Sequence, residues 1–286
     1  MTRAMAAKSF QIIGVGVAFS PNLKANLYEG ARLALFLQAK LVLIHVGKMS
    51  KEDSALLHDL LQVHHSRGLV YEISCQTGDP VEVIISTVKK AQIDLLILGA
   101  LQRENFLKYY LGSIARQITR KAPCSVLLLI KPSVERVPCE HIVVNGLADP
   151  KTGQTIETAF AIAKNLGAHK ITIVEEIRPQ EVAVSVDDDR SLRRSRIIKE
   201  RLKLREKSRV NQIIANVPET HKEGIAIQSQ SIFGKRGYSI GHYAQVVRAD
   251  LLVMNSPSRM TFWDRLFPHD IEHILGELPT DVLIVQ

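Results

Sequence analysis

The sequence lacks the features of a membrane-spanning, secreted or P-loop protein. Its longest apolar runs, such as Val126–Ile130, are far shorter than the roughly 20 residues that a spanning helix needs. The N-terminal stretch is basic but has no apolar segment, so we expect no secretory signal. The three cysteines form no C-x-x-C pair, which favours a reduced, cytoplasmic setting. No G-x-S-x-G, G-x-G-x-x-G or Walker-type loop occurs, which excludes the standard hydrolase, dinucleotide-binding and P-loop classes.

The sequence also lacks an evenly spread excess of positive charge. The net charge is +8, and ten Lys/Arg with only two Glu lie between Arg190 and Arg209. That segment accounts for the whole excess, so the attraction of an acidic partner is expected from it alone. The segment has no aromatic side chain for stacking on bases, which disfavours specific nucleic-acid recognition.

The 286 residues contain two copies of one plan. Residues 94–130 align without a gap with residues 250–286, which lie 156 positions later in the chain. Nearer the start of each half, matching residues such as Ile12 and Ile142 are only 130 positions apart. A repeat of this length is typical of a duplicated domain, and the change in spacing predicts an insertion in the second copy. We expect a first domain at residues 1–131, a linker at 132–138, and a second domain at 139–286 with an insertion at about 178–222.

Each copy alternates between strand and helix patterns. In the first copy, strands are expected at residues 10–17, 41–46, 70–75, 95–98 and 126–130, and helices at 23–38, 51–66, 80–91 and 113–121. Asp79 and Pro80 are typical of a helix start, with Asp79 as the N-cap. The alternation predicts an α/β fold of two tandem doubly wound parallel-sheet domains, the second with an inserted long basic helix.

The residues after the fourth strand of the first copy carry a family resemblance. Asp94–Gly99 precedes a loop, which is followed by Gly112-Ser113 and by an apolar run after Pro123. This pattern resembles the universal stress protein family in its tandem two-domain form, and the resemblance covers essentially the whole chain. It implies α/β domains of the universal-stress, adenine-nucleotide alpha-hydrolase-like type. Nucleotide-binding members carry Gly, two residues, Gly, nine residues and Gly-Ser/Thr; in this chain Gln102 replaces the second glycine.

The resemblance implies a site for ATP or a related adenine nucleotide in the first domain. The residues implied are Val46 near the base and Gly99, Gln102, Gly112, Ser113 and Ile114 on phosphate and ribose. A glycine at a strand end lets a ligand approach the backbone, and a helix N-terminus offers free N–H groups to a phosphate. We also expect Ser113 to cap its helix. No general base is evident, so we expect binding with at most slow ATP hydrolysis, and the sequence requires no metal.

Departures from the family pattern lower the affinity that we expect. The family places an acidic residue after the first strand, where this chain has Ala18, and Gln102 occupies space that a glycine leaves open. The loss of one charge-assisted hydrogen bond costs roughly 1.5–3 kcal/mol, or about ten- to over a hundred-fold in affinity. In the second domain Asn255, Ser258 and Pro268-His269 replace the motif, so no phosphate site is expected there.

The inserted segment from Asp187 to Val217 is predicted to form one long helix. Aspartates at its start favour the helix dipole, and its apolar residues recur at helical spacing. One interpretation is a helix that docks on its own domain and leaves a solvated basic face. The other is a surface for an acidic protein, a nucleic acid or an anionic lipid.

Two functions remain open. The first is a regulatory protein of the universal-stress type that binds a nucleotide in its first domain. The alternative is a stress-response scaffold that binds no nucleotide and acts through dimerisation and through the basic helix at Arg190–Arg209. The family often builds dimers by pairing the edges of its last strands. We therefore expect a homodimer, or an internal pseudo-dimer through Val126–Ile130 and Val282–Val285.

Overall fold

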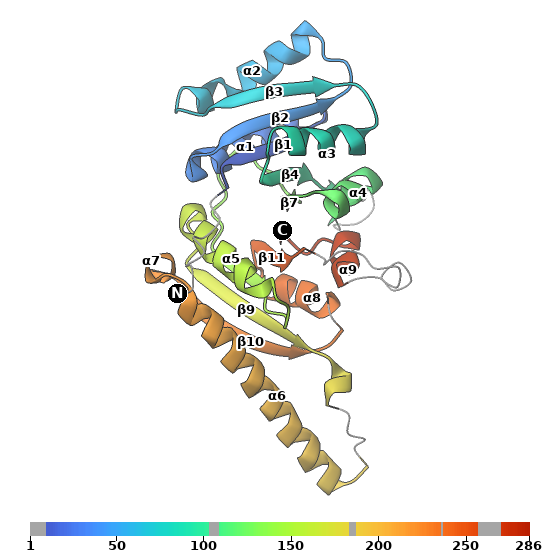
Figure 1. Cartoon of the computed structure of the whole chain (residues 1–286), viewed down its shortest axis with the longest axis vertical. Helices are drawn as coiled ribbons and strands as arrows, with labels where there is room; N and C mark the ends of the chain where they lie inside the picture. Colours follow the sequence, from blue (N-terminus) through green and yellow to red (C-terminus); the bar gives the residue numbers. More distant parts are fainter. Residues whose placement is uncertain (1–9, 103–108, 183–186, 236, 257–269) are drawn as a thin grey trace. The chain divides into compact units, whose positions relative to one another are not determined.

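The computed structural model describes residues 10–102, 109–182, 187–235, 237–256 and 270–286 (Figure 1). They fall into two compact units. The N-terminal unit contains Lys8–Pro138 together with Leu275–Gln286, and the C-terminal unit contains Cys139–Ile274. Each unit is an α/β sheet with helices packed on it, as the sequence predicts. The predicted domain limits stay a prediction.

The N-terminal unit contributes five parallel strands and one antiparallel strand, in the order β12-β7-β4-β1-β2-β3. The strands are β1 (Ile12–Val17), β2 (Lys40–Val46), β3 (Tyr71–Gln76), β4 (Leu95–Gly99), β7 (Ser125–Leu129) and β12 (Asp281–Val285). The helices are α1 (Leu23–Leu37), α2 (Lys51–His65), α3 (Pro80–Lys90) and α4 (Ser113–Lys121). Every strand and helix predicted for the first copy is present, with ends that differ by at most two residues.

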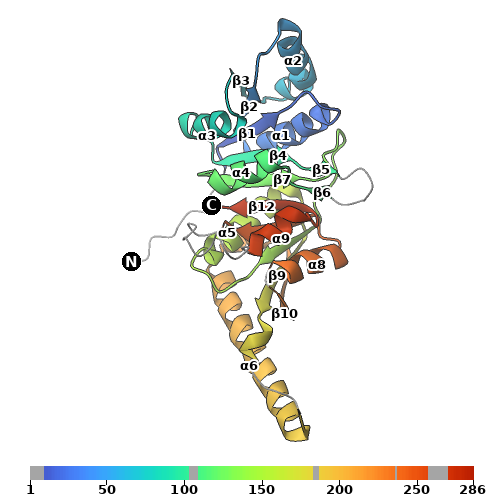
Figure 2. The same ribbon diagram turned by 90° about the vertical axis from the view of Figure 1, so that its right-hand side faces the viewer.

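Helices cover both faces of this sheet, which explains why its strands are apolar on both sides. α1 packs against α2 on one face, and α3 packs against α4 on the other (Figure 2). Ile13 and Leu43, on neighbouring strands, are fully buried. The predicted start of α3 is confirmed: Asp79 Oδ1 accepts hydrogen bonds from the backbone N–H groups of Val81 and Glu82, both at 3.0 Å, and Pro80 is the first helical residue.

The last strand of the chain completes the N-terminal sheet. β12 pairs antiparallel with β7, with Leu283 opposite Leu127, as predicted for these two segments. Two side chains fix the ends of this pairing. Asp281 Oδ1 accepts from the Ile130 N–H at 2.8 Å, and Ser125 Oγ accepts from the Gln286 N–H at 3.2 Å. The free edge of β7 is thus covered by the chain's own C-terminus.

The C-terminal unit repeats the plan with four parallel strands in the order β10-β9-β8-β11. The strands are β8 (His141–Asn145), β9 (Lys170–Ile177), β10 (Ala226–Phe233) and β11 (Leu251–Asn255). Its helical segments are α5 (Thr152–Leu166), the 3-10 turn η1 (Pro179–Glu181), α6 (Asp189–Asn216), α7 (Glu219–Lys222), α8 (Tyr238–Val246) and α9 (Asp270–Gly276). Along the chain, α6 connects β9 to β10, at the place where the first copy has the shorter α2 between β2 and β3.

α6 is the inserted basic helix that the sequence predicts. Asp188 caps it, because its Oδ1 accepts from the Ser191 N–H at 2.7 Å. The helix packs across β10 and β9 through one face, on which Ser195, Glu206 and Val210 are buried. Its first turns extend past the strands of this unit (Figure 1). The remaining faces of α6 are therefore left to solvent.

Candidate functional site: the crevice at the carboxyl ends of β1 and β4

The order of the N-terminal sheet reverses between β1 and β4. From β1 the chain moves outward through β2 and β3, and then returns to β4 on the other side of β1. In open α/β sheets, such a reversal sends the following loops in opposite directions, and ligands bind in the crevice expected between them. Val17 and Gly99 end these two strands, so the predicted Gly99 lies at the position where such sheets bind ligands.

Gly99 is in close contact with a residue that the sequence analysis did not single out. A Cβ atom at Gly99 would lie 3.2 Å from Asn26 Nδ2 and 3.3 Å from Asn26 Oδ1. The glycine therefore makes room for the amide of Asn26, which belongs to the first turns of α1. Asn26 Oδ1 is buried and has no hydrogen-bond partner within the described part of the chain. A polar residue in the first turns of the helix after the first strand was the available signal.

Gly112 and Ser113 form the N-terminus of α4, but the expected cap is wrong. Gly112 is the N-cap residue and Ser113 is the first helical residue, and no side chain caps this end. Gly112 O accepts from the Arg116 N–H at 2.9 Å, which starts the helical hydrogen bonds. Ser113 and Ile114 are exposed, and no side chain caps the first amides of the helix.

The loop between Gly99 and Gly112 is braced by a short pair of strands that the sequence did not predict. β5 (Leu101–Gln102) pairs antiparallel with β6 (Tyr109–Tyr110), so that the backbone of Gln102 lies opposite Tyr109. A Cβ atom at Gly112 would lie 3.1 Å from Leu101 Cδ1. The β5–β6 pair thus brings the residues after Gly99 close to Gly112. The side chain of Gln102 lies outside the described residues.

The end of the chain holds this loop in place. Leu278 donates its N–H to Tyr109 O at 2.9 Å, and Leu111 donates its N–H to Leu275 O at 3.1 Å. Arg116 Nη2 adds a bond to Leu275 O at 3.2 Å. The start of α4 is therefore fixed from both the sheet and the C-terminal segment.

Val46 also lies at the carboxyl end of its strand, β2, which is the neighbour of β1 in the sheet. It is the last residue of β2 and is partly exposed. Its neighbour His45 places Nδ1 3.2 Å from Val17 O, and the ring of Phe19 meets the His45 ring at a centroid distance of 5.1 Å. Ala18 is exposed directly after β1 and offers no polar group. Val46 and Gly99 thus belong to the same edge, and Ser113 and Ile114 begin the helix that follows β4.

At the corresponding strand ends of the C-terminal unit, polar side chains bond to groups of the same unit. Asn255 Nδ2 donates to Thr152 Oγ1 at 3.1 Å, and Thr152 Oγ1 donates to Leu147 O at 2.6 Å. Lys151 Nζ donates to Ser256 Oγ at 2.8 Å. Asn255 thus occupies the position that corresponds to Gly99 in the sequence repeat. Ser258 and Pro268-His269 lie outside the described residues.

Arg209 connects α6 to the residues that follow β8. Its guanidinium donates to Leu147 O at 3.2 Å and to Gly146 O, and its Nε donates to Glu206 Oε2 at 2.9 Å. The Glu206 carboxylate also accepts from Arg205 Nε at 2.9 Å. The end of β8 and the middle of α6 are therefore joined by one charged side chain.

A buried carboxylate lies under the same helix. Glu175, on β9, is 2% exposed and accepts from Ser231 Oγ at 2.6 Å and Ser229 Oγ at 3.1 Å. Burial raises the pKa of Glu175, and the two serine hydroxyls and the charge of Arg209 only partly oppose this effect.

Comparisons with known proteins place the chain. Residues 47–129 match the model of the universal stress protein family. This stretch is therefore similar to the universal stress protein family. A universal stress protein A-like protein of Arabidopsis thaliana is 29% identical over 85 residues, which are 30% of this chain and 48% of the relative. The match thus spans about half the length of that relative.

Solved structures of the family share the fold of both units. A universal stress protein of Archaeoglobus fulgidus DSM 4304 has a TM-score of 0.70 at 16% identity, covering 96% of this chain and 98% of that chain. A protein of Pseudomonas aeruginosa UCBPP-PA14 assigned to the same family has a TM-score of 0.69 at 18% identity, covering 97% of this chain and 93% of that chain. At these identities the likeness concerns the fold alone.

Two further properties concern the described residues as a whole. None of their helices combines the length and the hydropathy that a bilayer crossing needs. The same residues contain no group of three or more His, Cys, Asp or Glu side chains arranged to hold a metal ion.

Proposed function

We propose that the N-terminal unit binds ATP or a related adenine nucleotide in the crevice between β1 and β4, and that the protein acts as a regulatory module of the cytoplasm. The observation that carries this proposal is the uncapped N-terminus of α4, which begins at Gly112-Ser113 directly after the Gly99 loop. Helix N-terminal amides and the helix dipole together favour a phosphate.

Each implied residue has a role in this proposal. The amides of Ser113 and Ile114 and the Ser113 hydroxyl donate to phosphate oxygens. Gly99 and Gln102 contribute backbone to the ribose side, and Val46 contacts the base at the end of β2. These residues are proposals that rest on the family resemblance and on their places in the sheet.

Asn26 extends the proposed site. Its buried Oδ1 accepts hydrogen bonds only, and a ribose hydroxyl is a donor of the kind that it lacks. A buried acceptor without a partner costs about 1–3 kcal/mol, so a ligand that satisfies it gains affinity. Asn26 thus supplies an uncharged substitute on the side of the crevice where Ala18 offers no carboxylate.

The proposal is binding rather than turnover. Asn26, Ser113 and Ile114 carry no group that deprotonates water at neutral pH. Because the carboxylate of the family pattern is replaced by Ala18, we expect a weaker affinity, by about ten- to over a hundred-fold, than an acidic residue would give.

Calorimetric titration with ATP tests this function. The purified chain is titrated alone and as Gly112→Trp, which places an indole over the start of α4. Gly153→Trp is the matched control, because it also lies at a helix start and a Cβ there meets no atom within 4 Å. We expect binding heat in the wild type and in the control but not in Gly112→Trp. The absence of heat at millimolar ATP in the wild type refutes the proposal.

A second candidate function is a scaffold that binds no nucleotide, and the exposed basic faces of α6 favour it. Self-association belongs to the same candidate. Because β12 already pairs with β7, we propose that the chain supplies its own partner strand as an internal pseudo-dimer. A homodimer through that edge would have to displace β12. Sedimentation of the full chain and of a variant with Leu283→Pro separates the two states.

A further inference from the structure

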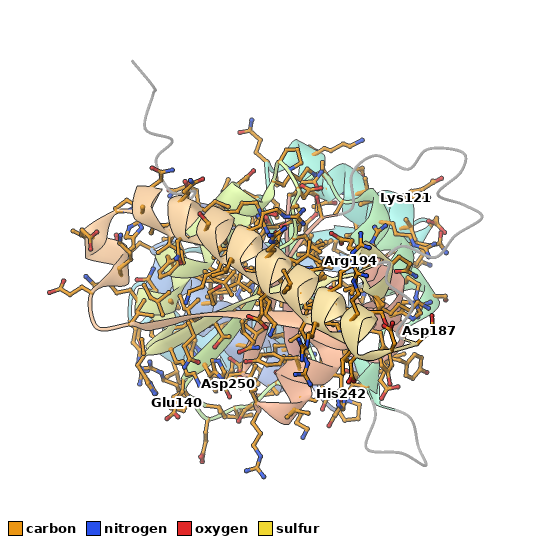
Figure 3. All side chains as sticks on the ribbon, turned by 90° about the horizontal axis from the view of Figure 1, so that it is seen from below. Lys121, Glu140, Asp187, Arg194, His242 and Asp250 are labelled. Atoms are coloured by element: carbon orange, nitrogen blue, oxygen red, sulfur yellow. The ribbon has the colours of Figure 1, made fainter. Side chains whose placement is uncertain are left out.

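The outer face of α6 is not used by the fold. The side chains that α6 packs on its own sheet recur at helical spacing, with Ser195, Glu206 and Val210 fully within the protein. The opposite side carries exposed residues over the whole length of the helix. Figure 3 looks at this helix from its outer side, with Arg194 labelled on it. Nothing in the C-terminal unit packs on this side within the described residues.

This outer face carries an apolar line. Ile197 is 53% exposed and Leu204 is 65% exposed. They are seven residues apart, which is close to two helical turns, so both side chains project on the same side. A shallow groove continues the line toward the C-terminus of the helix. It is lined by Leu204, Lys207, Ser208, Asn211, Gln212 and Ala215.

Basic side chains flank the apolar line on both sides. Arg194 and Arg201 each lie three residues before an apolar residue of the line, which places them along one flank. Arg196 and Lys207 lie along the other flank. All four are exposed, whereas Arg205 and Arg209 are engaged by Glu206. The four flanking charges are thus available for carboxylates of another molecule.

We infer that the outer face of α6 binds an acidic amphipathic helix of a partner protein. The apolar side chains of such a helix meet Ile197 and Leu204 and enter the groove at Ser208 and Ala215. Its carboxylates meet the flanking arginines, which favour planar carboxylate contacts. The inference names the partner class for the scaffold candidate and does not depend on nucleotide binding.

Charge and the apolar line favour an acidic helix over a second copy of α6, a lipid surface or a nucleic acid. A second copy of α6 brings the same positive charge, and like charges that face each other oppose association. A lipid surface favours a broad apolar face with aromatic residues, and α6 has no aromatic residue. A nucleic acid satisfies the arginines but leaves Ile197 and Leu204 without an apolar partner. An acidic helix with apolar residues satisfies both features.

The test uses a fluorescent synthetic helix of the length of α6, with leucine along one stripe and glutamate on both flanks. The control peptide has the same amino-acid composition in scrambled order. Binding to the full chain is measured by anisotropy at low and physiological salt. Vesicles of phosphatidylcholine with about one-third phosphatidylserine, as a model of an anionic leaflet, and a short DNA duplex are the competing probes.

Two paired variants separate the apolar from the charged contribution. Ile197→Ser/Leu204→Ser removes the apolar line, and Arg194→Gln/Arg201→Gln removes one flank. The matched controls are Val63→Ser/Val246→Ser, which are 50% and 65% exposed in the wild type, and Lys89→Gln/Lys90→Gln on α3. Circular dichroism confirms that each variant keeps its helix content.

We expect the patterned helix to bind more tightly than the scrambled one. The apolar variant should lose about tenfold in affinity or more, and the charged variant should lose affinity mainly at low salt. Neither control should change binding, and ATP titration should be unchanged in all variants. Equal binding of the scrambled helix, tighter binding of vesicles or DNA, or no binding of the patterned helix at low salt overturns the inference.

Discussion

Replacement of Arg209 by Met tests whether one side chain fixes α6 to the end of β8. Arg209 is the donor for two carbonyl oxygens, Gly146 O and Leu147 O, and for the Glu206 carboxylate. Methionine keeps the unbranched stem and a similar helix propensity. The change therefore removes the hydrogen bonds and the charge while it preserves most of the packing along the helix.

The magnitude follows from what is left behind. Loss of one partner from a fully buried ion pair costs about 3–5 kcal/mol. The Arg209 side chain is 27% exposed, and Glu206 keeps Arg205 as a partner at 2.8 Å, which reduces that figure. Hydrogen bonds from charged groups contribute about 1.5–3 kcal/mol each, and water replaces part of them at a half-open site. We expect a loss of about 2–4 kcal/mol in the free energy of unfolding.

Urea unfolding followed by far-ultraviolet circular dichroism measures this loss. Lys207→Met is the matched control, because Lys207 is an exposed basic residue on the same helix. A loss below about 0.5 kcal/mol in Arg209→Met, the usual range of an exposed substitution, would show that α6 is held by packing alone.

Two other changes probe the buried carboxylate and the last strand. Because burial raises the pKa of Glu175, the folded protein holds its proton to higher pH than the unfolded chain, and stability falls as pH rises above about 4.5 through the raised pKa. Glu175→Gln should therefore stabilise the protein at neutral pH and lose this advantage in acid; an unchanged difference across unfolding curves at several pH values contradicts the assignment. Leu283 is 2% exposed on β12, and Leu283→Ala should lower the free energy of unfolding by about 2–5 kcal/mol; a loss close to that of an exposed position would mean that β12 is not part of the core.

Much of the fold was predictable because it depends on local patterns. Buried runs and helical periodicity fixed the strands and helices of the first copy, and Asp79-Pro80 marked the start of α3 because an N-cap needs only adjacent residues. The pairing of the two segments at Val126–Ile130 and Val282–Val285 followed from the repeat and the family resemblance. These features depend on residues that are near in sequence or that recur.

The details of the site depend on residues that are far apart in sequence. Asn26 meets Gly99 only because β1 and β4 are neighbours in the sheet, and its place in the first turns of α1 does not by itself give that contact. Arg209 reaches from the inserted helix to Gly146 at the end of β8, although the sequence suggested only one more solvated charge. Ser113 was expected to cap α4, but Gly112 is the N-cap residue and Ser113 is the first residue of the helix. Such contacts follow from topology rather than from composition.

Amide hydrogen exchange with and without ATP tests the central claim most directly. If the start of α4 holds the phosphates, the amides of Ser113 and Ile114 and of the turn at Gly99 exchange more slowly when ATP is present. The corresponding segments of the C-terminal unit, at Asn255 and Ser256, should show no change. Exchange at Gly99 and Ser113 that ATP leaves unaltered, or protection confined to the C-terminal unit, contradicts the account.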